Sequence, residues 1–184
     1  MCIGLHTLPP CLLFCGNYIL HESEYDVHIF CVALDIIIYP TPLEEKDIRH
    51  KILVIKINRL YQRGMDEKVL YDAVRGVWRA SKKKVRTVEY VFGVYNSLIV
   101  AVYKPSEWFV CKEAKDRLPR QDIVLTPKTE NRLFFVDERY EQGFPSDENE
   151  SFYIGKSIAG LKLNQSAQNP ITYLYPLEKD KIHI

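Results

Sequence analysis

The stretch "TVEYVFGVYNSLIVAVY", residues 87–103, decides the fold of this 184-residue chain. Two runs rich in β-branched and aromatic residues flank the polar pair Asn96-Ser97. Alternating runs on either side of a short polar turn predict a β-hairpin. Working outward from this hairpin, we expect a fold that is rich in strands.

Further strands are predicted before and after the hairpin, because similar apolar runs end at polar or proline-containing stretches. They are "IFCVALDIIIY" (29–39), "KILVIKIN" (51–58), "WFV" (108–110), "RLFFVDER" (132–139) and "QNPITYLY" (168–175). The polar segments 112–131 and 141–150 contain prolines and are predicted to be loops.

One major helix is predicted over 66–81, where Asp66 can cap the first turn. Helical spacing places Leu70, Val74 and Val77 on one face together with Ala73 and Trp78. A short C-terminal helix is predicted from Ser157. The fold class is therefore α+β: a small curved antiparallel or mixed sheet, or a barrel, covered by one major basic helix and a short C-terminal helix.

The chain is long enough for one domain, which we place at residues 29–184. Residues 1–28 are predicted to be an extension rich in cysteine. Its Cys11, Cys15, His21 and His28 are possible zinc ligands, but they lack the paired spacing of zinc sites, so we predict no metal and no cofactor. The segment has neither a span-length apolar run nor the basic start of a signal peptide, so we expect a cytoplasmic protein without membrane contact.

The net charge of +1 conceals an asymmetry, because residues 1–50 hold two basic and seven acidic side chains and the remainder is mildly basic. Six of the twelve residues 75–86 are basic. A cluster of basic residues at helical spacing can bind phosphates, but it is also common on a helix face that simply contacts solvent. The predicted phosphate ligands here are Arg75, Arg79, Lys82, Lys83 and Arg86.

Aromatic side chains surround this basic stretch in the sequence. Rings beside cations hold unstacked bases, but they also fill protein cores. The candidates for base stacking are Trp78, Tyr90, Tyr95 and Trp108.

"YIGKS" (153–157) resembles the second signature of the GIY-YIG endonucleases, and "GVY" (93–95) resembles the first. That resemblance implies two signatures on neighbouring strands, then an arginine on the next helix and a metal-binding glutamate. Sixty residues separate Gly93 from Tyr153, and neither partner residue is in place. The sequence does not support a nuclease of this type. A glycine turn into a helix start leaves Lys156 and Ser157 as predicted phosphate ligands.

The segments "RGVWR" (75–79), "EYVFGVYNSLIVAVYKPSEW" (89–108), "YIGKS" and "AQNPITY" (167–173) together resemble a bacterial family of uncharacterised proteins over residues 50–175. That family brings no settled activity. The expected architecture is also similar, by shape alone, to the PUA-like group with its EVE, YTH and ASCH domains. This likeness implies recognition of RNA or of modified DNA bases by flipping a base into an aromatic pocket.

From these features we expect a non-enzymatic module that binds nucleic acid, DNA or RNA, and that reads a flipped or modified base in a restriction, defence or RNA-modification setting. One alternative is a metal-dependent nuclease or other nucleic-acid enzyme that uses acidic residues around 137–150. Another is an accessory subunit that binds a protein partner through the N-terminal segment.

Overall fold

The computed structural model describes residues 12–15, 18–21, 40–120, 123–161, 163 and 170–177. The chain divides into two compact units, residues 1–39 and 40–184. In the first unit, β1 (Leu12–Cys15) pairs antiparallel with β2 (Tyr18–His21). The predicted strand over 29–39 and the predicted boundary after residue 28 lie outside the described residues.

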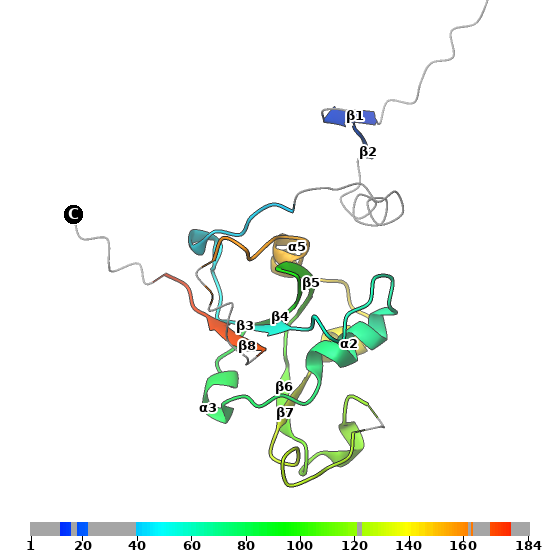
Figure 1. Ribbon diagram of the computed structural model, residues 1–184, viewed down its shortest axis with the longest axis vertical. Helices are drawn as coiled ribbons and strands as arrows, with labels where there is room; N and C mark the ends of the chain where they lie inside the picture. The colour runs from blue at the N-terminus through cyan, green and yellow to red at the C-terminus, as the bar shows by residue number, and fades with distance from the viewer. Residues whose placement is uncertain are drawn as a thin grey trace, which may run out of the picture. The chain divides into compact units, whose positions relative to one another are not determined.

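The second unit is built on a mixed four-stranded sheet (Figure 1). Its order is β5 (Leu98–Tyr103), β4 (Tyr90–Tyr95), β3 (Ile52–Lys56) and β8 (Ile171–Leu174). β3 runs parallel to β4, and the other pairs are antiparallel. The predicted hairpin is confirmed: Asn96 (φ 45°) and Ser97 (φ 68°) are both left-handed, as the tight turn between twisted strands requires.

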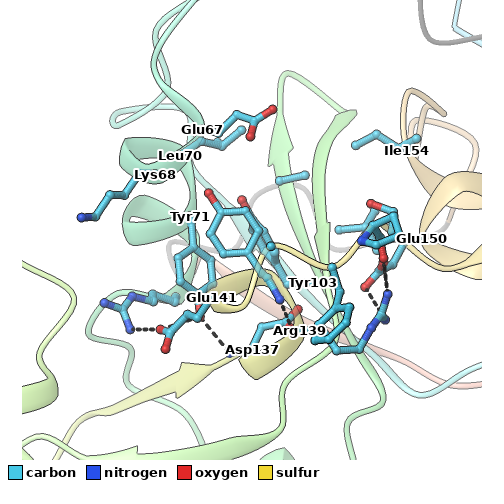
Figure 2. Close-up of a pocket in the computed structure, with 18 of the residues that line it drawn as sticks. Glu67, Lys68, Leu70, Tyr71, Tyr103, Asp137, Arg139, Glu141, Glu150 and Ile154 are labelled. Atoms are coloured by element: carbon cyan, nitrogen blue, oxygen red, sulfur yellow. Dashed lines mark hydrogen bonds and ion pairs between the residues drawn. The ribbon is translucent and has the colours of Figure 1, made fainter.

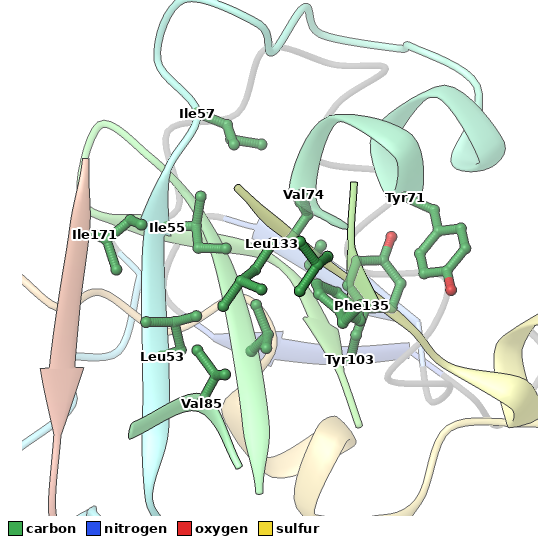
Figure 3. Close-up of a cluster of buried hydrophobic side chains, with 13 residues drawn as sticks. Leu53, Ile55, Ile57, Tyr71, Val74, Val85, Tyr103, Leu133, Phe135 and Ile171 are labelled. Carbon is green, nitrogen blue, oxygen red and sulfur yellow. The ribbon is translucent and has the colours of Figure 1, made fainter. Parts of the chain in front are cut away.

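Both faces of this sheet are buried. One face packs against α2 and the second sheet through a cluster that includes Leu53, Ile55 and Val91, part of which Figure 3 shows. The other face packs against α5 and the segment around Leu43 through Val54 and Phe92. A strand covered on both sides needs no polar face, which explains the unbroken apolar run of β4.

The predicted long helix is wrong at its C-terminal end. α2 spans Glu67–Arg75, and Asp66 caps it by accepting a hydrogen bond from the Lys68 amide. Gly76 leaves helical geometry, and Trp78 then exchanges backbone hydrogen bonds with Leu133. The basic residues that follow form a separate short helix, α3 (Lys82–Val85). The predicted phosphate ligands between Arg75 and Arg86 therefore do not share one helix.

The second sheet of this unit has two strands, β6 (Glu107–Val110) and β7 (Leu133–Val136), and both were predicted. Between them, the described residues 112–120 and 123–131 form no strand, as expected for a loop, and they include a short 3-10 helix, Lys115–Arg117. Another 3-10 helix, Glu45–Asp47, precedes β3.

The region after β7 differs from expectation. Instead of a loop over 141–150, it contains α4 (Glu138–Glu141) and α5 (Glu148–Tyr153), with Asp137 and Asp147 as their N-caps. The helix predicted from Ser157 is absent over 157–161, because Gly155 (φ 75°) turns the chain and Ser157 bridges Pro42 and Leu98.

The α+β class is confirmed, and the sheets are mixed or antiparallel. Over residues 40–120, 123–161 and 170–177 they do not close into a barrel. In the described part of the chain, no helix has the length and apolar character needed to cross a membrane.

Candidate functional site

Two surfaces of the second unit carry functional potential, a run of cations and a tyrosine-lined pocket. The first, which we call the basic segment, is residues 79–86. Its five cationic side chains are all exposed, and none of them forms an ion pair with a described residue. They are Arg79, Lys82, Lys83, Lys84 and Arg86.

Two contacts hold the basic segment in place. Ser81 caps α3 by accepting a hydrogen bond from the Lys84 amide, and the Val85 side chain is buried in the core. Lys84 Nζ lies 5.3 Å from the centre of the Tyr173 ring on β8. Because Val85 points inward, the charged side chains around it are left facing solvent.

Arg75 is not part of this surface, although it was predicted as a phosphate ligand. Its guanidinium donates to Asp72 Oδ1 at 2.8 Å and to Glu141 Oε1 at 3.2 Å. It also lies 4.9 Å from the centre of the Tyr71 ring, and the side chain is only 13% exposed. Two carboxylates already occupy the hydrogen-bonding groups that a phosphate would need.

Lys156 and Ser157 lie elsewhere again. Lys156 Nζ rests 3.2 Å from the centre of the Phe152 ring, and burial lowers the pKa of this lysine. The Ser157 backbone forms isolated β-bridges with Pro42 and with Leu98. Since no helix starts at Ser157, the predicted phosphate seat at a helix N-terminus is not present.

The four predicted base-stacking rings do not surround one pocket. Trp78 packs on the core and donates Nε1–H to the Val74 carbonyl at 2.7 Å, while Trp108 packs on Phe135. Tyr90 is buried on the opposite face of the sheet, where burial and a hydrogen bond to Asp147 raise its pKa to about 12. Tyr95 packs against Tyr61.

The second surface is a pocket of about 870 Å³ between α2, β5, α4, residues 143–146 and α5. We call it the tyrosine pocket, after the three rings on its wall, Tyr71, Tyr103 and Tyr140. Ring centres lie 5.0 Å apart for Tyr71 and Tyr103, 4.3 Å for Tyr71 and Tyr140, and 5.4 Å for Tyr103 and Tyr140. In Figure 2, Tyr71 and Glu141 line one side of the pocket, and the Arg139–Glu150 ion pair lines the other.

The hydroxyls of this trio differ in their bonding. Tyr71 Oη accepts from the Asp137 amide at 2.8 Å and donates to Glu141 Oε1 at 3.3 Å. The Tyr103 and Tyr140 hydroxyls make no hydrogen bond to a described residue. Burial is the largest cause that raises the pKa of all three tyrosines, and nearby acidic side chains add to it.

Carboxylates and two arginines form most of the remaining polar lining, and Asp147 lies next to it as a partner of Arg139. Arg139 lies 3.3 Å from both Asp147 Oδ2 and Glu150 Oε1. Burial raises the pKa of Glu150. Burial also acts to raise the pKa of Asp147. Hydrogen bonds from the Glu150 amide and from Tyr90, together with the charge of nearby Lys104, outweigh burial, so the pKa of Asp147 is lowered overall. Asp137 is 2% exposed and accepts only backbone amides, those of Lys104 and Tyr140.

The two surfaces lie at opposite edges of the four-stranded sheet. The pocket borders β5, whereas the basic segment contacts β8 through Lys84. With neighbouring strands about 4.8 Å apart, three steps separate the edge strands by about 14 Å. A base held in the pocket would therefore not sit beside phosphates held by the basic segment.

Sequence reasoning missed the tyrosine pocket. Its walls come from 67–75, 100–103, 137–146 and 150–154, and only the tertiary fold brings these segments together. The local sequence signal for this pocket was Asp137, because an Asp that follows an apolar strand is a common helix N-cap. The short helix α4 that Asp137 caps was not predicted.

Acidic residues around 137–150 were considered as a metal site. In the described part of the chain, no three His, Cys, Asp or Glu side chains are grouped to hold a metal ion. Asp147 and Glu150 instead contact Arg139. In comparisons with protein-family models, curated proteins and solved structures, none matches this chain.

Proposed function

We propose that this protein binds nucleic acid through contacts between the basic segment and backbone phosphates. One observation carries the proposal: five exposed cations within residues 79–86 lack an ion-pair partner among the described residues. Cations that a protein does not neutralise internally attract polyanions, and each phosphate contact releases condensed counterions.

Base reading is a separate part of the proposal. Trp78, Tyr90 and Trp108 pack in the two cores, so they do not support a shared base pocket. The likeness to PUA-like domains stays a prediction, and over the described residues the sheets do not close into the expected barrel. Reading of a flipped or modified base stays a prediction, and a comparison of binding to plain and to modified oligonucleotides would test it.

The test is fluorescence anisotropy with single- and double-stranded DNA and RNA over a range of salt concentrations. We expect binding to weaken as salt rises. The triple variant Lys82→Ala/Lys83→Ala/Arg86→Ala removes three exposed charges, so the slope of log K against log[salt] should fall by about 2 to 3, at roughly 0.7–0.9 per lost phosphate contact.

The matched control is Lys112→Ala/Lys115→Ala/Lys128→Ala, which removes three exposed lysines from the loop between β6 and β7. This control should keep the affinity and salt slope of the unmodified protein. Absence of binding at low salt would contradict the proposal. Equal losses in both triple variants would reduce it to non-specific attraction. Magnesium-dependent cleavage of the same oligonucleotides would favour a nucleic-acid enzyme instead.

A further inference from the structure

The tyrosine pocket has the size and the polarity of a ligand site. Its volume of about 870 Å³ falls within the roughly 300–1,000 Å³ of typical small-molecule sites. Its lining combines aromatic rings and apolar β5 side chains with eight charged side chains. The chemistry of the ligand follows from which of those charges the protein has already neutralised.

The two arginines of the lining are already neutralised. Arg75 pairs with Asp72 and Glu141, and Arg139 pairs with Asp147 and Glu150. Neither guanidinium is free to attract an anionic ligand. Lys68 is exposed, and Figure 2 shows it extending away from the tyrosines.

Two carboxylates of the lining have no cationic partner among the described residues. Asp137 is nearly fully buried and accepts only the amides of Lys104 and Tyr140. Glu67 is exposed on the first turn of α2, and in Figure 2 it extends over the pocket side of the helix. The charge left uncompensated in the pocket is therefore negative.

Tyr103 offers a hydroxyl to a bound group. The residue is 7% exposed, and its hydroxyl makes no hydrogen bond to a described residue. This hydroxyl is not one of the fully enclosed atoms without a partner, which among the described residues are Trp108 Nε1 and Tyr173 Oη. It is therefore open to solvent or to a polar group bound in the pocket that Tyr103 lines.

Aromatic faces beside uncompensated carboxylates are the groups that bind organic cations. We propose that the tyrosine pocket binds a small organic ammonium ion, with its charge near Asp137 and Glu67 and its alkyl groups against the rings of the tyrosine trio. Leu70 and Val102 supply the apolar wall for the alkyl part. This site is separate from the basic segment and does not depend on nucleic-acid binding.

The experiment titrates the full chain with choline and, in parallel, with its neutral carbon isostere 3,3-dimethylbutan-1-ol. Amide and aromatic chemical shifts of the pocket residues report binding. We expect choline to shift the resonances of Tyr71, Tyr103 and Tyr140 and to bind about tenfold more tightly than the isostere, since the two differ only in charge.

Two variants locate the charge. Glu67→Gln should weaken choline binding about threefold, as expected for an exposed carboxylate. Glu148→Gln removes an exposed charge from α5 outside the pocket and should leave binding unchanged. Equal affinity for choline and its isostere, no shift with either, or equal effects of the two variants would overturn the proposal.

Discussion

At the scale of single residues, Gly93 sets how closely α2 approaches the sheet. A Cβ at this position would lie 2.5 Å from Val74 Cγ2 and 3.2 Å from Ala101 Cβ. Both neighbours belong to the core, so the strain could not be relieved by a side chain moving into solvent. The sequence shows a glycine within a strand, which suggests a close backbone approach but does not say which element approaches.

Gly93→Ala should therefore lower the free energy of unfolding by about 1–3 kcal/mol, the usual cost of overpacking a core. Urea denaturation measures this change. Gly160→Ala is the control, because its added Cβ would find only the Leu43 carbonyl oxygen, at 3.8 Å. The control should stay within about 0.5 kcal/mol of the unmodified protein. If Gly93→Ala lowered the free energy of unfolding no more than Gly160→Ala does, Val74 would be able to move aside without cost.

At the scale of elements, the strands of the second unit were predicted, whereas the helix ends and the strands β1 and β2 were not. Runs such as "KILVIKIN" carry their own strand signal, and β3, β4, β5, β6, β7 and β8 all form where it appears. α2 stops at Gly76 because Trp78 pairs with Leu133, a partner far along the chain. α4 and α5 are only 4 and 6 residues long, too short to show a helical period.

The stability of α5 should depend on pH through its cap, Asp147. This carboxylate accepts the amides of Asn149 and Glu150 and contacts Arg139. Burial opposes its ionisation, but hydrogen bonds from the Glu150 amide and Tyr90, together with nearby Lys104, hold its pKa below the ordinary 3.8. A lowered folded-state pKa stabilises the fold above pH 3.8, and this contribution is lost as pH falls through the lower value. Asp147→Asn keeps a capping oxygen and removes the charge.

We expect Asp147→Asn to cost about 1–2 kcal/mol of unfolding free energy at pH 7, and the gap to the unmodified protein should narrow as the pH falls below 3.8. Denaturant titrations at a series of pH values measure it. Glu148→Asn serves as the control for a nearby exposed carboxylate. A gap that stays constant down to pH 3 would mean that the charge of Asp147 does not stabilise the fold.

At the scale of the whole molecule, strand order and the two surfaces lay beyond sequence reasoning. Nothing local in "TVEYVFGVY" indicates that β4 pairs in parallel with β3, nor that β8 takes the other edge of β3. The tyrosine pocket forms only when α2, β5, α4 and α5 are packed together in the folded protein. The cations of the basic segment were found from the sequence because charged side chains are mostly exposed, although Arg75 and Asp137 show that burial of a charge cannot be foreseen this way. The packing of Trp78, Tyr90 and Trp108 depends on tertiary contacts in the same way.

Hydrogen exchange should follow this architecture. β3 and β4 are paired on both sides and buried on both faces, so their amides should exchange only through global unfolding. Amides in residues 123–131 and in β6 and β7 should exchange faster, by local opening. Exchange followed by mass spectrometry or NMR tests the order. Slower exchange in β6 or β7 than in β4 would show that the small sheet is the more stable unit.

The position of β8 in the sheet has a consequence for biosynthesis. β3 spans Ile52–Lys56, but the partner that covers its free edge, Ile171–Leu174, is translated last of all the described strands. While the ribosome adds the intervening chain, the apolar edge of β3 is open to pairing with any other extended segment. A nascent chain that stalls before residue 171 would expose that edge to chaperones or to aggregation.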